Sequence, residues 1–191
     1  GAVTLDGSDL AGSPPHLVAR NGVARTFQNT ELFGDLTVIE NVMVGYQKRL
    51  SYGLFEAAFR IGRFHREEVE CRHAAEALLA FVGLTDSANE KARFLPFGMQ
   101  RRLEIARALA TAPRLLLLDE PAAGLTTQEI DELDRMIRRT ASFGISVLLI
   151  EHHVDLIMSV ADRVTVLDYG VVIATDKPGI VQNDPRGIEA Y

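Results

Sequence analysis

Residues 95–121 read LPFGMQRRLEIARALATAPRLLLLDEP, and this stretch decides the fold. A turn that contains a glycine opens it, and the residues that follow have the spacing of a basic amphipathic helix. The four leucines at 115–118 then predict a strand that is apolar on both faces, as in the interior of a parallel sheet. Asp119 and Glu120 follow at the carboxyl end of this strand, which is the edge where open α/β sheets bind ligands.

Two adjacent carboxylates at such an edge can divide the work of a hydrolytic reaction. One can hold a divalent metal ion while the other orients or deprotonates a water molecule. The same pair also fits a simpler interpretation, in which a core strand ends in two solvated acids. The motifs around the pair favour the first interpretation.

The whole stretch resembles the signature helix and Walker B segment of ATP-binding cassette (ABC) ATPases, which drive ABC transporters. In that family, a turn before the helix faces the γ-phosphate of an ATP that is bound to a partner subunit. A helix N-terminus suits this role because its free N–H groups and partial positive charge attract anions. The residues of that turn here are Leu95, Pro96, Phe97, Gly98 and Met99.

Two positions of this turn depart from the family pattern. The family usually has serine or alanine followed by glycine where this chain has Pro96 and Phe97. Proline fits the start of a helix, but it offers neither a hydroxyl nor an N–H to a phosphate. We therefore expect the loss of one γ-phosphate contact, worth roughly 1.5–3 kcal/mol for a hydrogen bond to a charged group. Arg101, Arg102 and Arg107 add positive charge and otherwise fit a solvated helix face.

An earlier segment continues the resemblance in the order found in the family. Residues 22–28, GVARTFQ, predict a β-rich segment that ends at Gln28. This segment resembles the Q-loop, whose glutamine reaches the magnesium ion and the attacking water. Its place in the series of motifs is what distinguishes Gln28 from any other glutamine after a strand.

The residues after Glu120 resemble the D-loop of the family. Thr126 stands where the family often has an aspartate, and together with Glu129 it has the spacing of a capping box that opens a helix. A second buried strand is predicted at 145–150, and His152 behind it aligns with the switch histidine that contacts the γ-phosphate.

The pair His152 and His153 also raises the possibility of a metal site. Neighbouring positions do not face the same way on a helix or a strand, and the spacing HExxH is absent. We therefore expect His153 to be a solvated residue in the first turn of a helix, and His152 alone to be functional.

A phosphate-binding loop of the form GxxxxGK[ST] is not found in the 191 residues. The lysines are Lys48, Lys91 and Lys177, and none of them closes that motif. By comparison with the family, we expect the sequence to begin in mid-domain, without the strand, P-loop and helix that precede the Q-loop. On this expectation, the chain is inactive as an ATPase by itself.

The predicted architecture is a single α/β domain with the P-loop NTPase core of an ABC ATPase. Residues 1–44 and 113–191 alternate strand-like and helical segments and predict the core with a parallel sheet. Residues 45–112 contain no convincing strand and resemble the inserted helical subdomain of the family, which carries the signature turn. Strands at 163–167 and 171–174 predict a hairpin.

Composition excludes several classes of protein. No apolar run approaches the roughly 18 residues of a membrane span. Cys71 is the single cysteine, so an internal disulfide is impossible. The net charge is −6 and the arginines are scattered, which disfavours a nucleic-acid surface. We expect a cytoplasmic protein that is peripheral on the inner face of the cell membrane.

Four further segments resemble one branch of the family, the LivG-type ATPases of branched-chain amino-acid importers. They are 25–29 (RTFQN), 36–42 (LTVIENV), 101–107 (RRLEIAR) and 183–191 (NDPRGIEAY). The resemblance covers essentially the whole chain.

The resemblance implies a mechanism in which two ATPase subunits sandwich two ATP molecules. Asp119 and Gln28 then hold Mg²⁺, Glu120 orients or deprotonates the attacking water, and His152 steadies the γ-phosphate. The signature turn 95–99 completes the ATP site of the partner subunit. Transmembrane permease subunits are contacted near the Q-loop and the helical subdomain.

Two alternatives from other functional classes remain open. One is a non-catalytic ABC-like interaction module, a pseudo-ATPase, which is slightly favoured by the departures from the family pattern at Pro96, Phe97 and Thr126. The other is an ABC-type ATPase of DNA maintenance, which needs a coiled-coil insertion or zinc-binding cysteines. The single cysteine and the absence of long heptads argue against the second.

Overall fold

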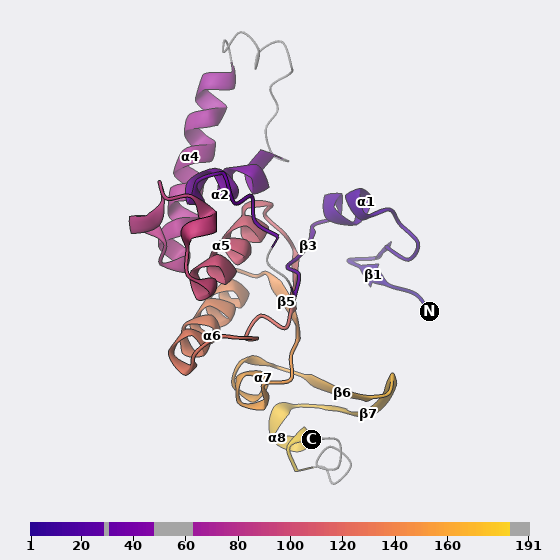
Figure 1. Cartoon of the computed structure of the whole chain (residues 1–191). Helices are drawn as coiled ribbons and strands as arrows, with labels where there is room; N and C mark the ends of the chain where they lie inside the picture. Colours follow the sequence, from indigo (N-terminus) through magenta and orange to yellow (C-terminus); the bar gives the residue numbers. More distant parts are fainter. Residues whose placement is uncertain (29–30, 48–62, 184–191) are drawn as a thin grey trace.

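A parallel three-stranded sheet forms the centre of the fold, as seen in a computed structural model that describes residues 1–28, 31–47 and 63–183 (Figure 1). Its strands are β3 (Val23–Arg25), β4 (Leu115–Asp119) and β5 (Ser146–Ile150), and β4 lies between the other two. Asp119 stands opposite Ile150 where β4 pairs with β5. Because the strands are parallel, their carboxyl ends meet at one edge of the sheet.

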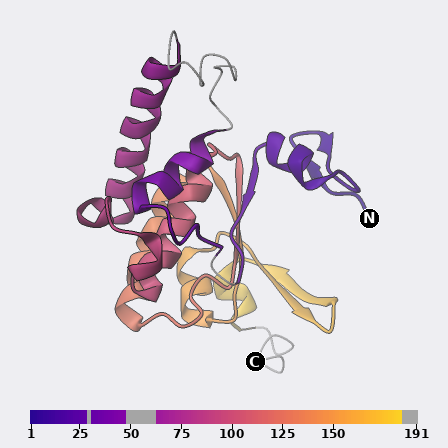
Figure 2. The ribbon, with the colours of Figure 1, turned by 45° about the horizontal axis from the view of Figure 1, so that its top comes forward.

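Helices cover the two faces of this sheet unequally (Figure 2). The helices α2, α4, α5 and α6 lie on one side, and the short α1 lies on the other. No helix in the described ranges is long and apolar enough to cross a membrane. The helix bounds are α1 Pro15–Arg20, α2 Val38–Tyr46, α4 Arg63–Val82, α5 Phe97–Ala110, α6 Thr127–Ser142, α7 Val154–Val160 and α8 Pro178–Val181, with 3₁₀ turns η2 Thr85–Ser87 and η3 Ala92–Phe94.

The central strand and α5 supply the middle of the hydrophobic core. Leu116 and Leu118 are buried, and they belong to one cluster with Leu103 of α5 and Val42 of α2. Burial of a leucine side chain stabilises a fold by roughly 1.5–3 kcal/mol, so this cluster anchors the sheet to its helices. The strand predicted from the four leucines is confirmed.

The prediction of a buried strand at 145–150 is wrong for one face of β5. Val147 and Leu149 pack against the core, but Leu148 and Ile150 are 54% and 56% exposed. In the described part of the chain, β5 is an edge strand of this sheet, and the helices cover only one of its faces. A run of apolar residues therefore predicted the strand but not its surroundings.

Two short antiparallel pairs complete the strands. β1 (Thr4–Leu5) pairs with β2 (Ser8–Asp9), and β6 (Val164–Asp168) pairs with β7 (Val171–Asp176). The hairpin predicted near the end of the chain is thus confirmed. Its turn uses Tyr169 and Gly170, which both have positive φ angles, as a tight two-residue connection requires.

The described part of the segment between β3 and β4 contains helices, turns and loops but no strand of the sheets. Residues 63–112 form α4, η2, η3 and α5, and no strand of the sheets lies among them. Residues 48–62 of the predicted helical subdomain lie outside the described residues, as do Asn29 and the end of the tail motif at 184–191.

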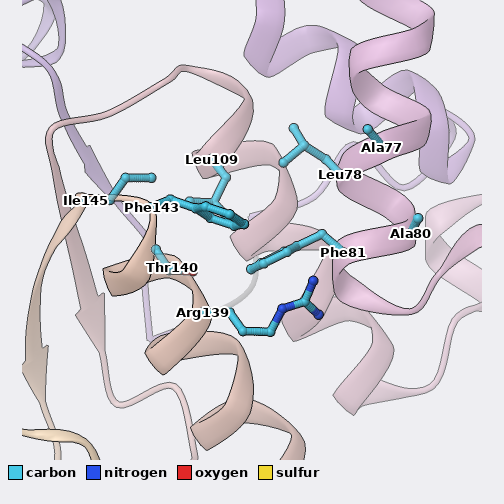
Figure 3. A pocket seen from close by; sticks show the side chains of 9 residues that line it. All are labelled: Ala77, Leu78, Ala80, Phe81, Leu109, Arg139, Thr140, Phe143 and Ile145. Atoms are coloured by element: carbon cyan, nitrogen blue, oxygen red, sulfur yellow. The ribbon is translucent and has the colours of Figure 1, made fainter.

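A cavity of about 440 Å³ lies where α4, α5 and α6 end (Figure 3). Its lining is largely apolar, and the rings of Phe81 and Phe143 lie 5.9 Å apart, centroid to centroid. The guanidinium of Arg139 lies 4.6 Å from the ring centroid of Phe81. This cavity marks the ends of α5 and α6 that are remote from the signature turn.

Candidate functional site

The backbone of Glu120 is strained. Its φ angle is +44°, in the left-handed region that residues other than glycine seldom adopt. The Glu120 N–H donates to the carbonyl of Ile150 at 2.8 Å, which ties this residue to the end of β5. Strained backbones persist only where the surrounding structure holds them, and they cluster at functional sites.

Gln28 and Glu120 meet at the carboxyl edge of the sheet. The Gln28 side-chain Nε2 donates to Glu120 Oε2 at 3.0 Å, although 92 positions separate the two residues in sequence. β3 brings Gln28 to this edge, and β4 brings Glu120. The structure therefore places two of the sequence-predicted site residues in direct contact.

Asp119 pairs with a residue that the sequence analysis did not single out. Arg25 Nη2 lies 2.8 Å from Asp119 Oδ2, and both side chains are partly exposed. Arg25 ends β3 beside the central strand, and its guanidinium also lies 5.2 Å from the ring centroid of Phe27. An arginine at the end of the strand before a glutamine carries no spacing signature, so only the pairing of the strands reveals this contact.

The residues at this edge fit a magnesium ion in the company of a nucleotide. Mg²⁺ in such sites is held by one or two carboxylates together with substrate phosphates and water. Asp119 supplies a carboxylate, and the amide oxygen of Gln28 is the end that does not contact Glu120. No group of three or more His, Cys, Asp or Glu side chains gathers as a metal site in the described residues. Phosphate oxygens are therefore needed to complete the ligand set.

His152 and His153 follow β5 and have different surroundings. The His152 side chain is 75% exposed beside this edge, whereas His153 is half-buried at the N-cap of α7. The prediction of a solvated His153 is wrong, because its Nδ1 atom is buried and has no hydrogen-bond partner among the described residues. Of these two histidines, His152 is the one whose side chain is open to a ligand.

The signature turn packs against the segment that follows β4. Leu95 is buried, Pro96 is the N-cap of α5 and Met99 packs against the core, so the turn is well formed as structure. The ring of Phe97 lies against Gly124, a residue with φ of +77°. A Cβ atom at Gly98 would overlap the carboxylate of Glu129 in α6, so a larger residue there requires the Glu129 side chain to move.

Arg101 is buried, so the prediction that it belongs to a solvated helix face is wrong. Arg101 Nη1 donates to the carbonyl of Phe27 at 2.6 Å, and Nη2 donates to the carbonyl of Gln28. Glu104, also buried, pairs with Arg101 at 3.2 Å and accepts a hydrogen bond from the Phe27 N–H at 3.1 Å. This ion pair fastens the Q-loop segment to α5. Phe97 and Ile105, which lie one helical turn before and after Arg101, were the available signal of its burial.

Local hydrogen bonds form the N-terminal cap of α6 and favour the charged form of Glu129 in its first turn. Thr126 and Glu129 form the predicted capping box, in which each side chain accepts from the other's backbone N–H. Hydrogen bonds from the backbone and then the side chain of Thr126 lower the pKa of Glu129. On α5, burial lowers the pKa of Arg107.

Comparison with known proteins identifies the family. A family model described as ABC transporter matches residues 1–123 of the chain. This chain belongs to the ABC transporter family. The α/β fold with its parallel sheet is the P-loop NTPase core of this family.

Several ABC ATP-binding proteins resemble this chain over its whole length. The high-affinity branched-chain amino acid transport ATP-binding protein BraF of Pseudomonas aeruginosa is 42% identical over 192 residues, which cover 100% of this chain and 75% of that protein. The high-affinity branched-chain amino acid transport ATP-binding protein LivG of Salmonella typhimurium shows the same identity and coverage. A probable LivG of Archaeoglobus fulgidus is 31% identical over 100% of this chain and 73% of that protein.

Solved structures agree with this assignment. A nucleotide-free ATP-binding cassette from an ABC transporter superposes with a TM-score of 0.81 at 28% identity, covering 100% of this chain and 76% of that chain. The ADP conformation of MJ1267, an ATP-binding cassette of an ABC transporter, gives the same values.

Proposed function

We propose that this chain is the ATP-binding and ATP-hydrolysing subunit of an ABC importer for branched-chain amino acids. The relatives that match its whole length are named for that substrate class. The observation that carries the proposal is the contact of Gln28 with Glu120 at 3.0 Å, beside Asp119. It places an amide and two acids at the edge where the sheet can receive a nucleotide.

Glu120 is the residue we assign to the attacking water. Its carboxylate orients the water or takes its proton as the water attacks the γ-phosphate. Gln28 holds one oxygen of that carboxylate, and the hydrogen bond from the Glu120 N–H to Ile150 fixes its backbone. His152, with its exposed imidazole, steadies the γ-phosphate from the neighbouring strand end.

Asp119 and Gln28 are the residues that would hold Mg²⁺, through a carboxylate oxygen and the amide oxygen. A bound magnesium ion supplies charge stabilisation to the phosphate oxygens. Arg25 Nη2 pairs with Asp119 Oδ2 at 2.8 Å, so a magnesium ion would compete with the Arg25 guanidinium for this carboxylate. The partial exposure of both side chains makes this exchange inexpensive.

The partners follow from the same proposal. A second ABC ATPase subunit binds an ATP molecule, and the signature turn of this chain, Leu95 to Met99, completes that ATP site. Transmembrane permease subunits contact the helical part, residues 45–112, while residues 1–44 and 113–191 form the α/β core. The complex is peripheral to the inner face of the cell membrane.

The 191 residues by themselves contain no GxxxxGK[ST] loop to cradle the phosphates. We expect this chain alone neither to bind ATP tightly nor to hydrolyse it. Calorimetric titration with ATP and Mg²⁺ measures this directly. Micromolar binding shows instead that another phosphate site exists.

One observation favours a second candidate, a non-catalytic ABC-like module. Pro96 is the N-cap of α5, and no side chain caps this helix. A proline at that position has no N–H to donate to a phosphate, so the signature turn is weakened as a catalytic element. Under this alternative, the assembled protein docks with its permease but shows no turnover.

Transport by the assembled protein tests the proposed substrate class and separates the proposal from the non-catalytic module. Vesicles are prepared with the ATPase, its partner and its permease, and uptake of radiolabelled leucine, isoleucine and valine is measured with ATP inside. We expect ATP-dependent uptake of these amino acids and none of ribose. Equal uptake of ribose contradicts the proposed substrate class, and uptake without ATP consumption supports the non-catalytic module.

A further inference from the structure

The side chain of Glu151 is buried between two turns without a strong cationic partner. It is 0% exposed, and in the described part of the chain the basic group within salt-bridge range is the imidazole of His152, at 4.0 Å. A buried charge is costly unless hydrogen bonds compensate for the lost water. The compensation here comes from backbone N–H groups.

Each oxygen of the Glu151 carboxylate binds a different turn. Oε1 accepts from the N–H of Ala122 at 2.7 Å, in the turn that follows Glu120. Oε2 accepts from the N–H groups of His152 and His153, at 3.0 and 3.2 Å. The carboxylate therefore joins the D-loop turn to the turn that carries the switch histidine.

A second bond links the same two turns. The Glu120 N–H donates to the carbonyl of Ile150 at 2.8 Å, one residue before Glu151. The strained backbone of Glu120 is thus held on one side by the end of β5, and the turn after it is held by Glu151. Removal of the carboxylate frees Ala122 and the His152 turn together.

We propose that Glu151 is a positioning residue for ATP hydrolysis, which sets His152 relative to Glu120. This inference rests on the proposed function, because it assumes that Glu120 and His152 act on the nucleotide. A carboxylate is required because the three donors approach both of its oxygens. A glutamine amide offers one acceptor, and its NH₂ group faces an N–H on the other side.

The test compares Glu151→Gln with the parent in the assembled, ATP-hydrolysing protein. We expect kcat to fall roughly ten- to a hundredfold, the effect of losing hydrogen bonds to a charged group, with KM for ATP within about twofold. In the 191-residue chain, amide hydrogen exchange at Ala122, His152 and His153 should accelerate. Asp155→Asn is the matched control, because Asp155 is an exposed acid four residues later and should leave kcat unchanged.

Parental kcat in Glu151→Gln overturns the inference, provided that Glu120→Gln loses turnover in the same assay. If Glu120→Gln also keeps parental turnover, the proposed function fails as well. If Glu151→Gln does not fold, Glu151→Asp decides. It keeps the charge but is one methylene too short to reach all three donors, so an intermediate kcat supports the inference and a parental kcat overturns it.

Discussion

The two ends of the α5–α6 helix pair differ in chemistry, although the same helices form both. At their amino ends, Gly98 meets Glu129 and the adjoining loops are joined by charged groups that bind backbone atoms. At their carboxyl ends, Phe143 and Leu109 line an apolar cavity (Figure 3). Directional hydrogen bonds can fix the placement of reacting groups, whereas apolar contacts contribute mainly stability.

This difference makes a general prediction about where substitutions act. Variants at the amino ends can change turnover as well as the free energy of unfolding, whereas variants at the carboxyl ends should change only the free energy of unfolding. Each of the following tests can break or sharpen that division.

The largest effect is expected for Arg101→Ala. The substitution leaves the buried Glu104 without its partner and releases the carbonyls of Phe27 and Gln28. Breaking a buried pair by removing one member costs about 3–5 kcal/mol, which urea unfolding of the 191-residue chain measures. The control is Arg72→Ala, which breaks an exposed pair with Glu76 and should cost under about 1 kcal/mol. Equal losses in the two variants mean that Arg101 does not hold the Q-loop.

Pro96→Ser is expected to change the rate rather than stability. A serine restores a hydroxyl and an N–H where the signature turn meets the partner's nucleotide. The contact is worth roughly 1.5–3 kcal/mol, so turnover of the assembled ATPase should rise about ten- to a hundredfold if it acts in the transition state. ATP affinity and the melting temperature should change little, because serine is also a good N-cap. Unchanged turnover with a lower melting temperature shows that Pro96 is only a structural N-cap.

Phe143→Ala probes the opposite ends of the helices. Phe143 is 68% exposed, and its ring pairs with that of Phe81. We expect a loss of about 0.5–1.5 kcal/mol, the usual worth of an aromatic pair, and turnover within twofold of the parent. Thermal unfolding and ATPase assays on the same preparation provide both numbers. A tenfold fall in turnover breaks the proposed division between the two ends.

The smallest effect is a pH dependence at the capping box of α6. Hydrogen bonds from Thr126 lower the pKa of Glu129 in the folded state. Its contribution is therefore present above the unfolded pKa, near the ordinary value of 4.5, and is lost as the pH falls through the lowered folded pKa. Glu129→Gln should lose less stability than the parent between pH 7 and pH 3 in urea unfolding. Identical losses in both proteins contradict this role.

Local patterns in the sequence predicted local structure well. The four leucines predicted β4, the two neighbouring strand-like runs at 163–167 and 171–174 predicted the hairpin, and the spacing of Thr126 and Glu129 predicted a capping box. Each of these depends on residues close together in the chain. A short stretch of sequence therefore contains all the residues that form each feature.

Interactions between distant segments were the ones that sequence reasoning missed. Arg101 was expected in solvent because its helix is basic, but it binds a segment more than seventy residues away. Glu151 bonds to backbone N–H groups, and every residue except proline has such a group, so no residue spacing could reveal its partners. The exposed face of β5 depends on what covers the sheet, which a run of apolar residues does not specify.

Turnover of Glu120→Gln in the assembled ATPase tests the central claim most directly. The amide keeps the shape of the side chain but cannot take a proton from water. We predict ATP binding within about twofold of the parent and a loss of at least about a hundredfold in kcat, the lower end of what a positioned base contributes. Hydrolysis at the parental rate with intact ATP binding contradicts the assignment of Glu120, and with it the account of the site at the carboxyl edge of β4.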